Sequence, residues 1–336
     1  MRELRAFREM SCKNRIFEGF CDKFEKHLSH FKAYLIKQAD NFEPELREAV
    51  ADCVKPQGKY LRPLLLFASA KSASYSDKTL QNRAAIVELI HLASLIHDDV
   101  IDNASMRRNS ETAYKKFGTR TAILLGDAVF AHAMQLAFKE RDERVWHMSV
   151  DAVKTLCEGE IRQSLAVEHE VSMQRYLSII EGKTATLFEL ACFMGASLSD
   201  TENCAWSKAA KLAGKHLGRA YQMYDDVCDW VLTEKDSGKT VGTDLLSEKQ
   251  TLPVIILLSK LPKSKSCKIS ENMSAFSAGE IRDLMKANAV LKECGDIFDE
   301  ELKKAKKAMR KFTGKNEALL EFCDAVNSMM PRVWND

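Results

Sequence analysis

Proline is scarce in this chain: the 336 residues contain six, and none lies between Pro63 and Pro253. Proline breaks helices and marks turns, and the same stretch has no Asn-Gly turns between alternating apolar strands, so it favours one helix after another. As a helix, residues 89–102 would carry apolar side chains on nearly all sides. Apolar residues also recur at helical spacing in 177–191 and 212–231. The sequence therefore predicts an all-α fold.

The chain also lacks an excess of charge of one sign, since 50 Lys and Arg face 48 Asp and Glu for a net charge of +2. That balance argues against the broad basic surface of a general nucleic-acid-binding protein. The ten cysteines include no Cys-x-x-Cys pair and no Cys/His ligand spacing. We therefore expect no zinc site, and we expect reduced thiols in a cytoplasmic protein.

Long apolar runs are missing as well, because none reaches the roughly 18 residues of a membrane-spanning helix. No membrane span is expected. Residues 1–17 are rich in arginine but contain Glu3 and Glu9 and have no apolar centre, which argues against a secretory signal. A surface helix is the preferred interpretation of this segment, and an organelle transit peptide is the alternative.

No low-complexity tract or repeat divides the sequence, and we expect a single domain over residues 1–336. Candidate breaks between helices are 54–58, 103–118, 141–144, 198–203, 234–250 and 261–279. The last of these is rich in Ser and Lys, and we expect a mobile surface loop there. Ser277 and Glu280 have the spacing of a capping box, which predicts that a further helix begins at this point.

Two copies of Asp-Asp-x-x-Asp are the most informative feature that is present. The first acidic block is Asp98, Asp99 and Asp102, and the second is Asp225, Asp226 and Asp229. On a helix, residues four apart share a face, and two like charges about 4 Å apart repel by roughly 4 kcal/mol at an effective dielectric of 20. Buried carboxylates must be paired or bind cations, and Mg²⁺ prefers oxygen ligands and commonly bridges to phosphate. The blocks predict a site for several Mg²⁺ ions and a diphosphate.

Two other interpretations compete for the acidic blocks. Solvated helix faces would explain one aspartate pair, but two matched blocks in apolar surroundings favour a shared site. A di-iron carboxylate bundle needs Glu-x-x-His on two helices. Glu88 and His91 form one such motif, and the sequence contains no second copy.

Basic residues surround both blocks in the sequence. Arg binds diphosphate oxygens as a fork and Lys binds them as a point charge, so their placement strengthens the diphosphate hypothesis. Gly238-Lys239 lacks the upstream pattern of a P-loop, which makes a P-loop NTPase improbable. The candidates are Lys59, Arg62, Arg107, Arg108, Lys183, Lys239 and Lys249.

With these residues in place, the chain resembles the trans-isoprenyl diphosphate synthases, and most closely their long-chain polyprenyl branch. The resemblance is continuous from about Lys55 to Pro253 and looser beyond. It is carried by the stretches GKYLRP, ELIHLASLIHDDVIDNASMRR, LLGDAVFAHA, EGEIRQ, EGKTATLF, LGRAYQMYDDVCD, KTVGTDL and KQTLPVI. It implies a bundle of long helices around a deep central cavity, the isoprenoid synthase fold, with the acidic blocks facing each other at the mouth.

The resemblance also implies a reaction: an allylic diphosphate ionises, isopentenyl diphosphate attacks the carbocation, and loss of a proton leaves a chain five carbons longer. Both acidic blocks would hold Mg²⁺, with three ions per site in the family's pattern, and a homodimer is implied. The allylic diphosphate would be contacted by Arg107, Lys183, Lys239 and Lys249, and isopentenyl diphosphate by Lys59, Arg62, His91 and Arg108. Thr184 and Gln222 would line the carbocation. The sequence departs from the family at Asn109, Thr240 and Glu248, and these departures affect loop geometry more than charge.

Product length is predicted from residues just before the first block. In the family an aromatic residue there stops growth early, whereas this chain has Ala93 and Ser94, with Ile90 a further turn away. We therefore expect a product longer than geranylgeranyl diphosphate, with Met134 or Phe138 as the floor of the cavity or as ordinary core. The alternatives are a geranylgeranyl or farnesyl diphosphate synthase, a terpene cyclase, and a non-catalytic subunit that tunes a heteromeric synthase.

Overall fold

The computed structural model describes residues 15–55, 58–70, 77–107, 110–164, 171–199, 204–231 and 249–332. The N-terminal half contains α2 (Arg15–Lys23), α3 (Glu25–Ile36), η1 (Lys37–Asn41), α4 (Pro44–Val54), α5 (Leu61–Ser69), α6 (Lys78–Ile101), β1 (Met106–Arg107), β2 (Ser110–Glu111), α7 (Ala113–Phe138) and α8 (Glu143–Ser164). The C-terminal half contains α9 (Met173–Ile180), η2 (Glu181–Ala185), α10 (Thr186–Ala196), α11 (Ala205–Val231), α14 (Leu252–Lys260), α15 (Lys263–Glu271), η3 (Met273–Ala275), α16 (Ala278–Ala287), α17 (Val290–Met309) and α18 (Glu317–Met329). The predicted all-α fold is confirmed, and β1 and β2 form a two-stranded antiparallel hairpin.

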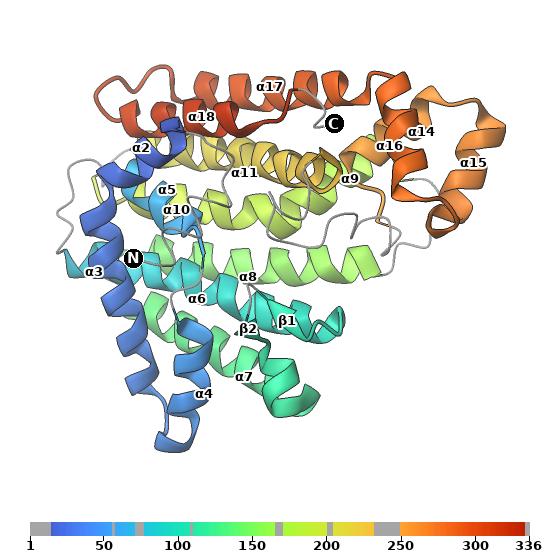
Figure 1. Cartoon of the computed structure of the whole chain (residues 1–336). Coiled ribbons are helices and arrows are strands. Elements are labelled where there is room, and N and C mark those ends of the chain that lie inside the picture. The colour runs from blue at the N-terminus through green and yellow to red at the C-terminus, as the bar shows by residue number, and fades with distance from the viewer. Residues whose placement is uncertain are drawn as a thin grey trace.

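The helices form a bundle in which α10 is central. Each residue of α10 except Glu189 is buried, because α5, α6, α8 and α11 pack around it. Figure 1 shows α17, α11 and α8 running in similar directions, with α6 and α7 on the side of α8 away from α17. The acidic blocks lie on two of the long helices, the first at the end of α6 and the second near the end of α11.

Local sequence explains where several helices begin. The Asp77 side chain accepts hydrogen bonds from the backbone N–H of Thr79 and Leu80 and so caps α6. Thr112 caps α7 in the same way. The capping box predicted at Ser277 and Glu280 is present at the start of α16. These caps satisfy backbone donors that a helix start otherwise leaves without partners.

The prediction of a mobile loop at 261–279 is wrong, because the segment contains α15 and η3. Pro262 precedes α15, and Ser266 and Ile269 of this helix are buried. The Ser- and Lys-rich composition concealed this buried face of the helix. The expected break at 103–118 is a short hairpin, after which α7 begins at Ala113 and is kinked at Gly118.

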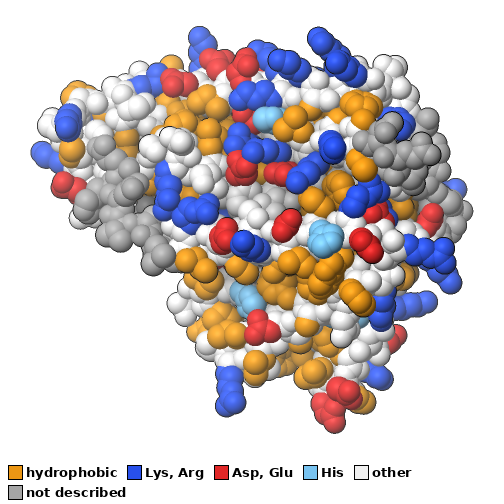
Figure 2. All heavy atoms as spheres, turned by 180° about the vertical axis from the view of Figure 1, so that it is seen from behind, with side chains coloured by type: hydrophobic (Ala, Val, Ile, Leu, Met, Phe, Trp, Pro, Cys, Tyr) orange, Lys and Arg blue, Asp and Glu red, His pale blue; other side chains and the backbone are white. Residues whose placement is uncertain are grey.

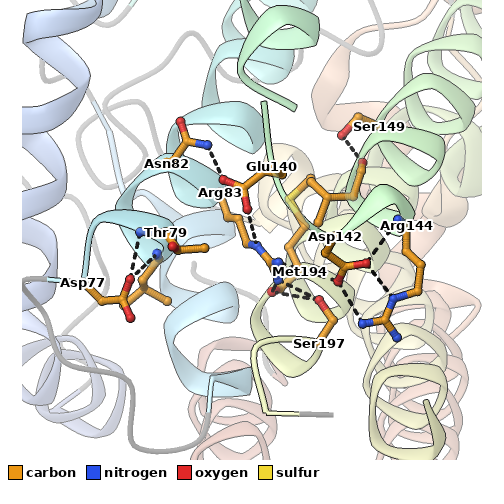
Figure 3. Close-up of polar contacts among 12 residues, drawn as sticks. Asp77, Thr79, Asn82, Arg83, Glu140, Asp142, Arg144, Ser149, Met194 and Ser197 are labelled. Carbon is orange, nitrogen blue, oxygen red and sulfur yellow. Dashed lines mark hydrogen bonds and ion pairs between the residues drawn. The ribbon is translucent and has the colours of Figure 1, made fainter. Parts of the chain in front are cut away.

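A buried ionic cluster holds the end of the bundle remote from the acidic blocks (Figure 3). Arg83 of α6 donates to Glu140 and to the Met194 carbonyl and Ser197 hydroxyl at the end of α10. Both Arg83 and Glu140 are at most 7% exposed at their side chains. Arg83 lies fifteen residues before Asp98 on α6, about 22 Å at 1.5 Å per residue. The cluster therefore joins α6, the α7–α8 connection and α10 far from the candidate site.

The helix α7 is the one described helix whose length and composition would suffice to cross a membrane. Core helices of many proteins pass the same test, and here α7 packs along the length of α6.

Candidate active site

The first acidic block ends α6, and its three carboxylates have different surroundings. Asp98 is half-buried, Asp99 is buried and Asp102 is exposed at the C-cap. The hairpin brings Arg107 back to the block, where its Nε and an Nη each lie 2.7 Å from Asp99 Oδ1. Burial raises the pKa of Asp98 to about 6 although Lys183 opposes the shift, and burial also raises the pKa of Asp99 against the pull of Arg107.

The second acidic block lies on α11 and repeats this arrangement. Asp226 is 4% exposed, and both of its oxygens accept hydrogen bonds. Gln222 Nε2 donates to Oδ1 at 2.9 Å, while the Tyr176 hydroxyl and the Leu252 N–H donate to Oδ2 at 2.6 and 3.3 Å. Burial raises the pKa of Asp226 to about 6, and the hydrogen bonds from Tyr176 and Gln222 limit the rise.

In each block the middle aspartate is buried and hydrogen-bonded, whereas the outer two keep some exposure. The outer residues are four apart and so share a helix face, which makes them the carboxylates that can meet a cation. Among the described residues, no group of three or more His, Cys, Asp or Glu side chains is arranged to hold a metal ion without help. Mg²⁺ is commonly bound by one or two carboxylates together with water and substrate oxygens.

The two blocks converge on the same place in the structure. Lys249 lies three residues before Leu252, whose N–H donates to Asp226 of the second block, and its Nζ is 4.0 Å from Asp102 Oδ1 in the first block. Lys183 in η2 is close enough to Asp98 to lower its pKa. The next residue, Thr184, donates a 2.7 Å hydrogen bond to Gln222, one turn before Asp226 on α11. The segment η2 thus lies between the first and the second block.

Comparison with known proteins identifies the family. Residues 43–290 match the family model described as Polyprenyl synthetase. The chain belongs to this family. It is 37% identical over 203 residues to an octaprenyl diphosphate synthase of Haemophilus influenzae, which covers 60% of this chain and 61% of that relative. It is 33% identical over 277 residues to a prenyl transferase of Porphyra purpurea, with 81% of this chain and 84% of the relative covered.

Solved structures agree with this assignment. A polyprenyl synthase from Caulobacter crescentus, solved with calcium and isoprenyl diphosphate, has a TM-score of 0.81 and 27% identity, covering 94% of this chain and 98% of that one. A decaprenyl diphosphate synthase from Rhodobacter capsulatus has a TM-score of 0.83 and 26% identity, covering 94% and 99%. The family resemblance inferred from the motifs is confirmed. The match to the Haemophilus relative spans about three fifths of that protein.

In this polyprenyl synthetase family member, the first two predicted basic residues, Lys59 and Arg62, flank the start of α5. Tyr60, between Lys59 and Arg62, has left-handed backbone angles (φ 49°, ψ 41°). That conformation costs a non-glycine residue roughly 1–2 kcal/mol. It is offset by burial of the Tyr60 ring, whose centroid lies 5.4 Å from that of Phe31. The turn starts α5 so that the Arg62 guanidinium lies 5.6 Å from the ring centroid of Phe188, just after η2.

Several predicted residues lie outside the described part of the chain. These are Arg108 and Lys239, together with the family departures Asn109, Thr240 and Glu248. His91 is described and is half-buried on α6. Its backbone carbonyl accepts a 2.7 Å hydrogen bond from the Ser94 hydroxyl.

The residues predicted to set product length differ in exposure. Ile90 and Ala93 are fully buried, whereas Ser94 is half-buried on the side of α6 that also carries Asp98. Met134 is half-buried against the core. Phe138 is 73% exposed at the end of α7, with its ring 5.7 Å from that of Trp146. Within one chain Phe138 thus lies at the surface, and Met134 is the better placed of the two to face the bundle interior.

Sequence reasoning missed two residues of the site. Glu160 of α8 lies 2.7 Å from Lys183 Nζ, and Tyr176 of α9 holds Asp226. Glu160 belongs to the EGEIRQ stretch that carried the resemblance, so the sequence did give a signal for it. Tyr176 gave none, because a tyrosine at helical spacing is indistinguishable from a core residue until the fold places it 2.6 Å from a carboxylate.

Proposed function

We propose that this chain is a Mg²⁺-dependent trans-prenyltransferase. It would condense isopentenyl diphosphate with an allylic diphosphate primer to make a trans-polyprenyl diphosphate. The observation that carries this proposal is that the short segment η2 links the two Asp-Asp-x-x-Asp blocks, with Lys183 beside Asp98 and Thr184 bonded to Gln222. A site that gathers accessible carboxylates and lysines together suits a substrate that is itself a metal-bound polyanion.

The carboxylates present suit magnesium. Asp98, Asp102, Asp225 and Asp229 are the accessible members of the blocks and would hold the ions, which the family pattern puts at three. Asp99 and Asp226 would position these four, since Arg107 binds one and Tyr176, Gln222 and Leu252 bind the other. When bound, the ions would neutralise negative charge that develops on the leaving diphosphate.

The side chains of this protein supply binding, orientation and charge, and no nucleophilic side chain is needed. Arg107, Lys183 and Lys249, with Lys239, would bind the allylic diphosphate, and Lys59, Arg62 and His91, with Arg108, would bind isopentenyl diphosphate. The carbon–oxygen bond of the allylic diphosphate breaks, the isopentenyl double bond forms the new carbon–carbon bond, and the departing diphosphate takes the released proton. Holding the double bond beside the cation replaces a bimolecular encounter. Oxygens of Thr184 and Gln222 would face the carbocation.

A product longer than geranylgeranyl diphosphate follows from the small residues before the first block. Ala93 and Ser94 leave α6 without an aromatic plug one turn before Asp98. Relatives named octaprenyl, heptaprenyl and solanesyl diphosphate synthase support the long-chain assignment.

The test is to incubate the purified chain with Mg²⁺, farnesyl diphosphate and labelled isopentenyl diphosphate. A ladder of longer prenyl diphosphates that disappears on chelation supports the proposal. A hydrocarbon product would identify a terpene cyclase instead, and no turnover would favour the non-catalytic subunit. In that last case a partner would be sought, because one relative is named heptaprenyl diphosphate synthase component 2.

We also propose that the enzyme is a homodimer that pairs through α7. Ile123, Leu124 and Phe138 of this helix are 40%, 58% and 73% exposed. Figure 2 shows apolar side chains gathered over the lower part of one face, at the level where Figure 1 places α7. Exposed apolar patches of this kind mark interaction surfaces. Light scattering should give twice the chain mass for the wild type and a lower mass for Leu124→Lys, and a monomeric wild type would contradict the proposal.

A further inference from the structure

The turn η2 between α9 and α10 is π-helical, and it carries Lys183 and Thr184. Turns of this kind are rare in proteins, and those that occur are often at functional sites. Although adjacent in sequence, the two residues reach different helices: Lys183 Nζ lies 2.7 Å from Glu160 on α8, and Thr184 donates to Gln222 on α11. Both side chains therefore depend on how η2 is seated against its neighbours.

The first residue of η2, Glu181, is bound to α11 by two cations. Its carboxylate oxygens pair with Lys215 and with Arg219. These residues are four apart on the helix and share the face that Gln222 continues three residues later. Burial alone would raise the pKa of Glu181, but hydrogen bonds from Lys215 and Arg219 outweigh it and lower the pKa. The carboxylate is thus charged at neutral pH and holds η2 to α11 electrostatically.

The other end of η2 touches the backbone of α11 directly. A Cβ atom at Gly218 would lie 2.5 Å from the Cα of Ala185, so only glycine permits this approach. The turn is therefore fixed on α11 at its start by Glu181 and at its end by the Gly218 contact. Lys183 and Thr184 lie between these two points.

We propose that Glu181 is a positioning residue for the allylic diphosphate. By binding Lys215 and Arg219 it sets the register of η2 on α11, and so directs Lys183 toward the first acidic block and Thr184 toward Gln222. Glu181 itself makes no contact with substrate in this account. The inference rests on the proposed prenyltransferase function, in which Lys183 binds the allylic diphosphate.

The experiment compares Glu181→Gln with Glu301→Gln. Glu301 is a matched control because it also pairs with Arg219, at 3.7 Å, but it lies on α17 and its hydrogen bonds come from His216 and Lys304. Since a charge-assisted contact is lost, we expect Glu181→Gln to raise the KM for farnesyl diphosphate about tenfold while the KM for isopentenyl diphosphate stays within about twofold. Glu301→Gln should change neither KM, although it should lower stability.

Two further measurements keep the test decisive if Glu181→Gln folds poorly by circular dichroism. Lys215→Met removes one of the two partners and should shift the same KM in the same direction. Calorimetric titration with inorganic pyrophosphate and Mg²⁺ should show weaker binding by Glu181→Gln than by Glu301→Gln. Wild-type values in both Glu181→Gln and Lys215→Met would overturn the inference. A wild type without turnover would instead overturn the proposed function, and pyrophosphate binding would still decide the role of Glu181.

Discussion

Ser94 gives the sharpest test of how this chain would set product length. It lies four residues before Asp98, about 6 Å along α6, and it is half-buried while its neighbour Ala93 is fully buried. A prenyl tail whose diphosphate is held at Asp98 would have to pass this position to enter the bundle. Phenylalanine in place of Ser94 would obstruct that path, and we expect Ser94→Phe to yield products of geranylgeranyl length or shorter.

The size of the effect follows from the burial of hydrocarbon. Each buried methylene contributes about 0.8 kcal/mol, so a five-carbon unit that finds no space loses about 4 kcal/mol. Because 1.4 kcal/mol is tenfold, this corresponds to nearly three orders of magnitude against each excluded unit. Even a partial obstruction should therefore move the whole product ladder and not only its tail.

The assay is chromatography of products from labelled isopentenyl diphosphate and farnesyl diphosphate, with Ile101→Phe as the control. Ile101 ends the same helix, is 54% exposed and should leave the ladder unchanged. Ala93→Phe should also shorten the product, but it overpacks a buried position and should cost about 1–3 kcal/mol of stability. An unchanged ladder from both Ser94→Phe and Ala93→Phe would refute this account of chain length.

Three other predictions follow from the structure. Asp225→Ala should reduce initial rates by at least about 100-fold, and rates within about twofold of wild type would exclude Asp225 as a metal ligand. His216 and Lys304 outweigh burial and lower the pKa of Glu301 from 4.5 to about 2. Its stabilisation, on the order of 3 kcal/mol, should thus be complete above pH 4.5 and lost as the pH falls toward 2. Urea unfolding should accordingly show wild type and Glu301→Gln converging in that window, and parallel curves would contradict it. Arg83→Met should lower the free energy of unfolding by about 3–5 kcal/mol, since it leaves Glu140 buried without its cation, and adding Glu140→Gln should restore part of that loss.

Helix positions and the acidic blocks could be predicted because both are properties of neighbouring residues. The breaks near 141–144 and 198–203 fall where α7 ends and α8 begins, and where α10 ends before α11. The spacing of Asp98 and Asp102 fixes their common face by helix geometry alone. Predictions of this kind need no knowledge of what packs against the helix.

Partners from distant elements could not be predicted in the same way. The Tyr176 hydroxyl meets Asp226 across 50 positions of sequence, and Glu181 meets Arg219 across 38. The π-helical turn η2 also gave no signal, because its residues keep the apolar spacing of an ordinary helix. Its geometry is set by contacts with α8 and α11, including the close approach at Gly218.

The two acidic blocks share one arrangement, in which the middle aspartate is buried and hydrogen-bonded and the outer two are more exposed. In each, the residue next to the first aspartate is turned into the bundle, where Arg107 binds Asp99 and Tyr176 binds Asp226. At 100° per residue the outer two aspartates lie about 40° apart, and the middle one lies about 60° to 100° round the helix from them, so anchoring the middle residue fixes how the face shared by the other two is turned. A carboxylate is suited to the anchor because it accepts several strong hydrogen bonds at once, as Asp226 does from three donors. Under the proposed function, this arrangement gives the third acidic residue a role in orienting the other two, and we expect replacement of Asp99 or Asp226 to weaken metal affinity by disturbing that orientation.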